Sequence, residues 1–583
     1  MKYSKLIDEV RSRAEIWTGK DYDETTRIYV QQLLDADDST DLIESFYKDL
    51  EFGTGGLRGI MGVGTNRMNK YTVGAATQGL SNYLKKEFAK LPEIKVVIGY
   101  DCRHNSREFA QIAADIFTAN GIKVFLFDDL RPTPEVSYAI RKLGCQSGVI
   151  VTASHNPKEY NGYKAYWNDG AQMIAPHDKN TIAEVNKIRA ASEIKFIGNP
   201  SLIEIIGKEM DDAYINALKT ISLSPEVISR HHALKIVYTP IHGAGVRIVP
   251  EALKRFGFTY IINVPEQDVV SGKFPTVESP NPEEPAAMMK AVERAKETGA
   301  ELVLASDPDA DRVGVAVKNN EGEWVLLNGN QMALLFVYYL ITRWKELNRL
   351  TGKEYIIKTI VTTETIRAIA DKNVVTCYDV YTGFKWIADA MRKNEGKKKF
   401  IGGGEESFGF LCEDFVRDKD AVSACCIMAE IAVYAKDQGL TVYNLLNRIY
   451  AEYGYSKEVG ISVKKEGKSG AEEIEAMMKK FRKQPLTEIG GSKVTMTHDY
   501  ASLKGYSFVD KEDFSLNMPT TSNVLQYFTE DDSKISIRPS GTEPKIKFYI
   551  EVHEPVKSVK DIPAAEKASL KKIEKIKASL GID

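Results

Sequence analysis

The sequence predicts an α/β protein made of three similar α/β units followed by a small α+β domain. Short apolar strands alternate with helices between about residues 95 and 405, and this rhythm starts afresh twice. After residue 453 the pattern changes to a few strands with helices at both ends. Strands separated by helices favour mostly parallel sheets with helices on their faces. The length of 583 residues exceeds what one hydrophobic core supports, so several domains are expected.

The expected elements follow from hydrophobic periodicity and from stop signals such as Gly121, which closes a helix. The expected strands lie at residues 96–100, 124–127, 148–151, 235–238, 301–305, 355–361, 400–402, 494–497, 535–537 and 546–550. The expected helices lie at residues 22–34, 41–47, 107–120, 249–256, 331–344, around 474–481 and at 564–579.

These elements divide the chain into a helical extension and four domains. The predicted segments are the extension at residues 1–49, domain I at 50–205, domain II at 206–327, domain III at 328–452 and domain IV at 453–583.

The composition excludes several classes of protein. The net charge is −3, from 78 basic and 81 acidic residues, and no basic tract is present, which argues against nucleic-acid binding. The six cysteines lie apart, without zinc-ligand spacing, as is usual in a reducing compartment. The first residues show no signal peptide, and the longest apolar stretch, at residues 332–342, is too short to span a membrane. A cytoplasmic protein with no membrane partner is expected.

A loop at residues 152–157 directly follows an apolar strand and presents Ser154. Ligand-binding loops in open α/β sheets gather at the carboxyl ends of strands, which suits a nucleophile. Asn156 and Pro157 favour an ordinary turn by themselves. From this loop alone both interpretations stay open.

A second loop, at residues 305–312, carries Asp307, Asp309 and Asp311 before Arg312. Three alternate carboxylates can converge on one hard cation, which prefers oxygen ligands, whereas without a cation they would repel one another. The spacing is that of the first half of an EF-hand loop, but the remaining EF-hand features are missing. A solvated acidic loop is the alternative interpretation.

Two further loops carry groups that can bind hydroxyl groups and phosphate. At residues 402–407, glycines precede Glu405 and Ser407, which can hydrogen-bond hydroxyl groups, although a glycine-rich turn without a ligand stays possible. At residues 538–545, Arg538 and nearby hydroxyl and backbone N–H groups form a potential phosphate cradle.

The four loops together indicate phosphoryl transfer. Phosphate monoesters hydrolyse so slowly that enzymes supply rate enhancements up to ~10²¹. Serine alone is a weak nucleophile, and a cation on the transferring group supplies electrostatic stabilisation. A nucleophile, a cation loop, a hydroxyl-binding loop and a phosphate cradle in successive domains therefore complement one another.

Taken together, these motifs resemble the α-D-phosphohexomutase superfamily, the family of phosphoglucomutase and phosphomannomutase. The resemblance extends from about residue 52 to residue 552, and the loops at 152–157 and 307–312 are its most specific parts. It implies four domains around a central cleft, three of them related α/β domains with mixed sheets and the last an α+β domain.

The resemblance also implies roles for individual residues. Ser154 matches the phosphoserine, with His155 beside it, and one Mg²⁺ per chain would be held by an oxygen of phosphorylated Ser154 and by three aspartates, Asp307, Asp309 and Asp311. Lys164 is the first candidate for general acid/base work, and Arg58 is an electrostatic clamp because guanidinium does not titrate usefully. The expected substrate-binding residues are Arg312, Thr382, Gly383, Lys385, Glu405, Ser407, Arg538, Ser540, Gly541 and Thr542.

The sugar loop has the Gly-Glu-Glu-Ser form of phosphoglucomutases, whereas mannose-tolerant and glucosamine-specific relatives usually differ at Glu406. Residues 52–59 and 163–177 are most similar to a branch that also contains phosphopentomutases and bisphosphate-sugar synthases. The expected reaction interconverts glucose 1-phosphate and glucose 6-phosphate, with glucose 1,6-bisphosphate as intermediate and activator. Phosphomannomutase or phosphopentomutase activity is the alternative. A monomer or homodimer that binds small sugar phosphates is expected.

Two rival classes of function share some of these motifs. A phosphatase or phosphodiesterase could use the serine and the metal, but it would have little need for a second phosphate cradle. A non-catalytic scaffold that binds sugar phosphates would most easily lose the nucleophile or a metal ligand. This chain keeps the serine and all three aspartates.

Overall fold

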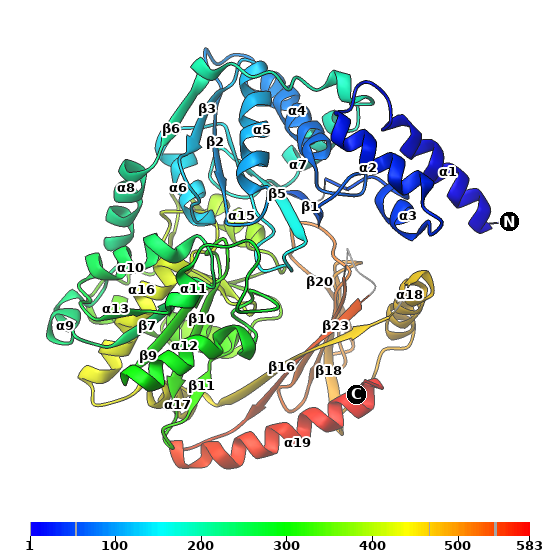
Figure 1. The fold of residues 1–583 in the computed structure, drawn as a ribbon. Coiled ribbons are helices and arrows are strands. Elements are labelled where there is room, and N and C mark those ends of the chain that lie inside the picture. Colours follow the sequence, from blue (N-terminus) through cyan, green and yellow to red (C-terminus); the bar gives the residue numbers. More distant parts are fainter. Residues whose placement is uncertain (1, 53–54, 466, 541–544, 583) are drawn as a thin grey trace.

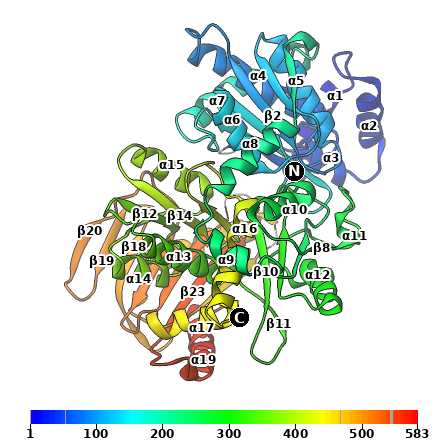
Figure 2. The same ribbon diagram turned by 90° about the vertical axis from the view of Figure 1, so that its left-hand side faces the viewer.

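The computed structural model describes residues 2–52, 55–465, 467–540 and 545–582. Strands in this part of the chain form four successive sheets, one for each predicted domain. Figures 1 and 2 show the first sheet beside the N-terminal helices, the second and third sheets packed together, and the last sheet with the C-terminal helix on the remaining side.

The N-terminal extension is a small helical layer on domain I. Trp17, Phe46 and Tyr71 pack edge to face in its core, and Tyr71 comes from the first long helix of domain I. This contact joins the extension to the first sheet. The helices are α1 (Lys2–Ile16), α2 (Glu24–Asp35) and α3 (Thr40–Phe46).

Domain I is a six-stranded mixed sheet with the order β1-β5-β4-β2-β3-β6. Alternate residues of its central strands face opposite layers: Val96 and Ile98 pack under α4 and α5, whereas Val97 packs under α6. The elements are β1 (Gly56–Ile60), α4 (Lys70–Glu87), β2 (Lys95–Tyr100), α5 (Ser106–Ala119), β3 (Lys123–Phe127), α6 (Thr133–Leu143), β4 (Ser147–Val151), β5 (Tyr160–Trp167), α7 (His177–Val185) and β6 (Ile203–Ile206), with short 3₁₀ helices at Ala191–Glu193 and Pro200–Leu202.

Domain II has the sheet order β11-β10-β9-β7-β8. The helix α12 covers one face of this sheet through Ala287 and Met288, and α10 packs on the other side. The elements are α8 (Lys208–Lys219), α9 (Pro225–Arg230), β7 (Ile236–Thr239), α10 (Gly245–Phe256), β8 (Ile261–Asn263), α11 (Pro265–Asp268), α12 (Pro285–Thr298), β9 (Leu302–Ser306), β10 (Val313–Lys318) and β11 (Trp324–Leu326).

Domain III has the sheet order β13-β12-β14-β15 and shares a hydrophobic core with domain II. At the centre of this core lies α16, of which fifteen residues are buried, and it contacts α10 of domain II and α13 of domain III. A helix that is apolar on all sides must be enclosed. The elements are α13 (Gly329–Glu346), β12 (Glu354–Thr359), α14 (Thr365–Lys372), β13 (Thr376–Val380), α15 (Phe384–Asn394), β14 (Lys399–Glu405), β15 (Gly409–Cys412), α16 (Ala421–Asp437) and α17 (Val442–Tyr453).

Domain IV is an antiparallel sheet with two helices on one face. Ile546, Phe548 and Ile550 of β23 join the core beneath these helices, so the intervening Lys547 and Tyr549 point to the opposite face. The elements are β16 (Tyr455–Lys464), α18 (Gly467–Lys483), β17 (Glu488–Ile489), β18 (Ser492–Asp499), β19 (Lys504–Ser507), β20 (Glu512–Ser515), β21 (Leu525–Thr529), β22 (Lys534–Pro539), β23 (Lys545–Glu554), a 3₁₀ helix (Val559–Asp561) and α19 (Ile562–Leu580).

All four motif-bearing loops occupy the same kind of position. Each joins two consecutive antiparallel strands: β4 to β5, β9 to β10, β14 to β15 and β22 to β23. In domains I to III the first strand of each pair also runs parallel to an inner strand of its sheet. In domains I to III the loops therefore project from corresponding edges of the three sheets.

The predicted fold class is confirmed. In domains I to III the inner strands pair in parallel, as the alternation of strands and helices predicted, and an antiparallel strand after each functional loop makes the sheets mixed, as the resemblance implied. Strands β5, β10 and β15 were not predicted, because each returns directly after a functional loop without an intervening helix. In the part of the chain that the structure describes, no helix combines the length and the apolar character needed to cross a membrane.

Candidate active site

Ser154 lies immediately beyond β4, in a conformation that few side chains adopt. Its φ is 53°, in the left-handed region, and its residue surface is 3% exposed. Its backbone N–H donates to Thr152 Oγ1 at 2.9 Å. The loop therefore holds the serine in one orientation instead of forming a freely solvated turn.

The three aspartates of the second loop converge, as the sequence predicted. Asp307, Asp309 and Asp311 are all buried, and each offers a carboxylate oxygen within 4.8 Å of the others. Asp307 Oδ1 accepts the backbone N–H groups of Asp311 and Arg312, both at 3.0 Å. Asp309 Oδ1 and Asp311 Oδ1 are buried and make no hydrogen bond within the described chain. Buried carboxylate oxygens without partners suit a hard divalent cation.

The serine and the aspartates meet across the boundary between domains I and II. Ser154 Oγ donates to Asp307 Oδ2 at 2.8 Å. Lys164 Nζ, from β5, lies 2.7 Å from Asp309 Oδ2 and 3.0 Å from Asp311 Oδ2. Two strand-end loops from different sheets thus build one centre.

The electrostatics of this centre reflect charge crowding in a buried place. Burial, followed by repulsion from Asp309 and Asp311, raises the pKa of Asp307. Burial would also raise the pKa of Asp311, but Lys164 and then Lys419 outweigh it and lower that pKa. Burial alone would lower the pKa of Lys164, and the two aspartates it contacts raise it instead. Asp311 and Lys164 therefore favour each other's charged forms, whereas the surroundings of Asp307 favour its neutral form.

Two residues that sequence reasoning missed complete the surroundings of the aspartate loop. Lys419 Nζ, from the segment before α16 of domain III, lies 2.9 Å from Asp311 Oδ2. Thr133, the first residue of α6, donates through Oγ1 to Asp309 Oδ2 at 2.8 Å and through its N–H to the Asp309 carbonyl. Neither residue stands in a recognisable motif, and only the packing of three domains brings them here.

His155 and Arg58 flank the nucleophile. The nitrogen Nδ1 of His155 is 3.1 Å from Ser154 Oγ. Burial, followed by the positive charges of Arg312 and Arg58, lowers the pKa of His155 to about 2, so its ring is neutral. Arg58, on β1, donates to Asn156 Oδ1 at 3.2 Å and is otherwise exposed.

The sugar loop, at residues 402–407, is held by hydrogen bonds to the carboxyl groups of Glu405 and Glu406. Ser407 Oγ donates to Glu405 Oε2 at 3.0 Å, and burial raises the pKa of Glu405 to about 7. Thr359 and Thr362 both donate to Glu406 Oε2, at 2.9 and 3.2 Å. The loop carbonyl of residue 408 accepts the Val313 N–H, which connects the sugar loop to β10. The sugar and aspartate loops are therefore adjacent.

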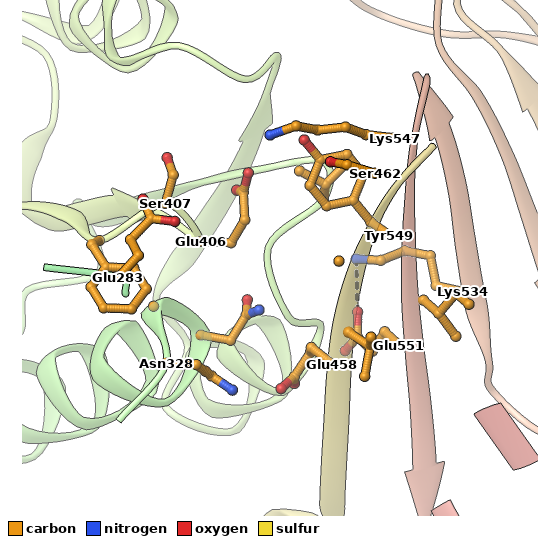
Figure 3. Close-up of a pocket in the computed structure, with 17 residues that line it drawn as sticks. Glu283, Asn328, Glu406, Ser407, Glu458, Ser462, Lys534, Lys547, Tyr549 and Glu551 are labelled. Atoms are coloured by element: carbon orange, nitrogen blue, oxygen red, sulfur yellow. Dashed lines mark ion pairs between the residues drawn. The ribbon is translucent and has the colours of Figure 1, made fainter. Parts of the chain in front are cut away.

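A cavity of about 360 Å³ separates the sugar loop from the sheet of domain IV (Figure 3). Glu406 and Ser407 line one side, and Lys547 and Tyr549 of β23 line the other. Arg538 pairs with Lys547 in the register of β22 and β23. Because residues paired in register lie on the same face of the sheet, Lys547, which the motif did not include, shares a face with Arg538.

The remaining predicted residues lie around this cleft. Gly383 has a φ of 111° and precedes α15, with Thr382 before it and Lys385 in the first turn of the helix. Burial and the nearby positive charge of Arg538 lower the pKa of Lys385, so domains III and IV present cations to the same region. Arg312 is paired with Glu283. Ser540 N–H donates to the Lys545 carbonyl, and the remaining two predicted positions lie outside the described residues, namely Gly541 and Thr542.

Comparison with protein families covers most of the chain. Four models match in order, described as phosphoglucomutase/phosphomannomutase alpha/beta/alpha domains I, II and III and the C-terminal domain. They match residues 49–192, 212–322, 328–453 and 461–569, respectively.

Curated relatives match over nearly their whole length. A phosphoglucomutase of Staphylococcus haemolyticus is 35% identical over 528 residues, which are 90% of this chain and 94% of the relative. A phosphoglucomutase of Staphylococcus aureus is 36% identical over 540 residues, 92% and 95% of the two chains.

Solved structures show the same fold at low identity. Paramecium pp63/parafusin, a phosphoglucomutase solved in an open form, has a TM-score of 0.68 at 18% identity, over 92% of this chain and 96% of its own. A phosphoglucomutase/phosphomannomutase family protein from Burkholderia thailandensis has a TM-score of 0.65 at 17% identity, over 91% and 97%.

Proposed function

This chain belongs to the phosphoglucomutase/phosphomannomutase family, and we propose that it interconverts glucose 1-phosphate and glucose 6-phosphate through a phosphorylated Ser154. The contact between Ser154 Oγ and Asp307 Oδ2 carries the proposal, because it joins a nucleophile to a cation-binding loop. The choice of glucose is supported by the curated relatives, which are named phosphoglucomutases.

The reaction consists of two phosphoryl transfers in opposite directions. In the first, the O6 hydroxyl of glucose 1-phosphate attacks phospho-Ser154; the Ser154 Oγ–P bond breaks, its electron pair stays on Oγ, and the hydroxyl proton is taken up nearby. The product, glucose 1,6-bisphosphate, turns over in the cleft. In the second, Ser154 Oγ attacks the phosphorus at position 1; the bond from this phosphorus to O1 breaks, O1 takes up the proton that O6 gave up, and glucose 6-phosphate is released.

The aspartate loop has the composition of a magnesium site. Asp307, Asp309 and Asp311 would hold the ion, together with an oxygen on Ser154, and the buried unpartnered oxygens of Asp309 and Asp311 support this assignment. When bound, Mg²⁺ supplies electrostatic stabilisation to the charge on the transferring phosphoryl group. Lys164 and Lys419 offset part of the negative charge of the aspartates through ion pairs with Asp309 and Asp311.

Proton transfer at Ser154 is assigned to groups that already face it. The neutral ring of His155 is 3.1 Å from Ser154 Oγ and can exchange a proton with it. Lys164 is our candidate for acid/base work at the sugar oxygen, and Arg58 stabilises negative charge at the mouth of the loop. A reacting hydroxyl can be protonated or deprotonated only by a group within hydrogen-bond reach.

Different residues are assigned to the phosphate that does not react and to the sugar hydroxyls. Arg538 and Lys547 would hold the phosphate that does not react, because both face the cleft from domain IV. Glu405 and Ser407 would bind sugar hydroxyls in both orientations of the intermediate, and Thr382, Gly383, Lys385 and Arg312 would complete the sugar end. The rival phosphatase would not need this second cationic site.

A coupled assay tests the proposal directly. The purified protein is given glucose 1-phosphate, mannose 1-phosphate or ribose 1-phosphate with Mg²⁺ and a trace of the matching bisphosphate, and glucose 6-phosphate formation is followed with a dehydrogenase. We expect the highest kcat/KM for glucose 1-phosphate. Faster turnover of mannose or ribose phosphate would replace glucose as the substrate, and no turnover of any of the three would refute the mutase assignment.

A further inference from the structure

Arg103 is a buried arginine that binds the backbone of the nucleophile loop. Its Nη2 donates to the carbonyl oxygens of Ser154, at 2.6 Å, and Asn156, and its Nη1 donates to those of Pro157, at 2.8 Å, and Tyr160, at 3.1 Å. One guanidinium therefore holds four carbonyl groups of the segment from residue 154 to 160. No other described side chain makes as many hydrogen bonds to this segment.

Asp101 fixes both this arginine and the start of the same loop. Asp101 Oδ2 lies 3.4 Å from Arg103 Nε, and both side chains are fully buried. The same oxygen accepts Thr152 Oγ1–H at 2.6 Å, and Thr152 Oγ1 in turn accepts the Ser154 N–H. The carboxylate thus reaches Ser154 by two routes, through Arg103 to its carbonyl group and through Thr152 to its N–H.

The fold explains why these groups meet. Asp101 directly follows β2 and Thr152 directly follows β4, and these two strands are parallel neighbours in the sheet, with Tyr100 opposite Val151. Their carboxyl ends therefore lie side by side. Ser154 has a left-handed φ of 53°, a conformation that persists only where the surroundings enforce it. The hydrogen bonds of Arg103 and Asp101 provide that enforcement.

Domain II packs against Arg103 and the turn that carries it. The ring of Phe274 lies over the Arg103 guanidinium at 5.1 Å and is 2% exposed. At Gly272 a Cβ atom would come within 2.6 Å of the His104 backbone nitrogen, so this segment packs closely on the turn that carries Arg103. The domain that supplies the aspartate loop thus also shields the group that orients the nucleophile.

We propose that Arg103, held by Asp101 and covered by Phe274, is the positioning residue that orients Ser154 for phosphoryl transfer. Arg103 does not touch the reacting oxygen; it acts on the main chain on either side of it. The planar guanidinium directs its two terminal nitrogens to four carbonyl groups while its Nε faces the Asp101 carboxylate at 3.4 Å, which the three donors of a lysine ammonium cannot reproduce. This inference rests on the proposed phosphoserine chemistry and assigns to that site a residue outside its motifs.

The test compares Arg103→Lys with wild type under the same conditions. A small displacement of a reacting group costs about 100-fold in rate, so we expect kcat to fall about 100-fold while KM for glucose 1-phosphate changes by less than about threefold. Single-turnover transfer from glucose 1,6-bisphosphate to Ser154, followed by intact-protein mass spectrometry, should slow by the same factor. A residue that merely supports the fold would not slow the chemical step selectively.

Arg343→Lys is the matched control. Arg343 is also largely buried, at 12% side-chain exposure, donates to a backbone carbonyl and pairs with two glutamates, but it lies in α13, away from the loop. Its substitution should leave kcat unchanged. Equal losses of kcat in the two variants, a loss confined to KM, or wild-type kinetics in Arg103→Lys would overturn the proposal.

A second variant covers the case in which Arg103→Lys does not fold, as judged by thermal unfolding. Asp101→Asn keeps an acceptor for Thr152 but removes the charge that holds Arg103, so we expect an intermediate loss of kcat, about 10-fold, again with KM preserved. Wild-type kcat in folded Asp101→Asn would overturn the proposal. If instead wild type itself shows no mutase activity, the proposed function fails, independently of the comparison between variants.

Discussion

Ser154 of domain I and Asp307 of domain II, 153 positions apart in the sequence, share a hydrogen bond of 2.8 Å in the buried centre of the molecule. Both residues lie at the end of a strand and at the beginning of a loop that leads to an antiparallel neighbour. The contact joins the two most specific motifs of the sequence. The buried charges of Asp309, Asp311 and Lys164 lie beside this contact. A nucleophile and a cation site that act together must be adjacent in this way.

Replacing the nucleophile should abolish turnover without unfolding the protein. Ser154→Ala removes the oxygen that carries the phosphoryl group, so we expect kcat to fall by at least about 10⁴-fold. The coupled assay measures this loss, and intact mass should show no phosphorylation. Ser147→Ala, at the start of the strand β4 that leads to this loop, is the control, since its hydroxyl donates to the Tyr166 carbonyl. Activity of Ser154→Ala near that of the control would remove the central claim.

Weakening the aspartate loop should weaken magnesium binding. Asp309→Asn keeps the shape but removes one charge from the three carboxylates, so the Mg²⁺ concentration for half-maximal activity should rise at least about 10-fold. In thermal unfolding, Mg²⁺ should stabilise wild type, since a ligand that binds only the folded state does so by mass action, and should stabilise the variant less. Asp268→Asn, elsewhere in domain II, serves as the control. An unchanged Mg²⁺ requirement in Asp309→Asn would contradict the site.

Removing the phosphate cradle should affect binding more than chemistry. Arg538→Ala deletes a charge-assisted hydrogen bond of about 2–3 kcal/mol, so kcat/KM should fall roughly 30- to 150-fold, mainly through KM. Arg482→Ala, on α18 of the same domain, should change neither constant, because Arg482 is paired with Asp499 of β18. Steady-state kinetics with glucose 1-phosphate decide the matter. If KM for Arg538→Ala equals that of the control, the cradle lies elsewhere.

The activity should show a pH dependence that arises from Glu405. Burial raises the pKa of Glu405 from 4.5 to about 7, so the carboxyl group is neutral below pH 7 and ionised above it. An ionised carboxylate accepts hydrogen bonds from sugar hydroxyls more strongly. We therefore expect kcat/KM to rise between pH 6 and pH 8, on the order of several-fold, and Glu405→Gln to lose this rise.

The raised pKa of Glu405 also affects stability. Its contribution to the free energy of unfolding decreases with rising pH, whereas the activity increases. Because the folded protein holds this proton more tightly than the unfolded chain does, the contribution of Glu405 is fully present below pH 4.5 and is lost as the pH rises through about 7. Unfolding free energies of wild type and Glu405→Gln should therefore diverge over that interval, and parallel curves would show that Glu405 titrates normally.

The junction between domains III and IV should depend on the half-buried carboxylate of Glu364. Glu364 Oε1 lies 2.8 Å from Lys358 Nζ and 2.6 Å from Lys534 Nζ, and these lysine side chains are 1% and 3% exposed. Glu364→Gln removes one carboxylate partner from each lysine, while Asp379 still pairs with Lys358 and Glu551 with Lys534, so we expect a cost of about 1–3 kcal/mol. Denaturant unfolding measures the loss. Glu297→Gln, which breaks an exposed ion pair with Arg294, should cost under about 1 kcal/mol.

The local patterns of the sequence were sufficient for much of this architecture. Hydrophobic periodicity placed the expected helices and the inner strands close to their observed positions, because an element that buries one face records that face in its sequence. The motif at Ser154 and the alternating carboxylates at Asp307, Asp309 and Asp311 indicated phosphoryl transfer with a cation, because that chemistry needs those groups at short spacing.

Tertiary structure alone decided which distant residues surround that chemistry. Lys419, Thr133 and Lys547 stand in no motif. Lys419 and Thr133 reach the aspartate loop because domains III and I pack against it, and Lys547 of domain IV faces the sugar loop across the cavity. Arg103 had a weak signal, an Asp–x–Arg sequence just after a strand, but its four carbonyl partners lie more than 50 residues away. Such contacts depend on which strands are neighbours, and hydrophobic periodicity carries no record of strand order.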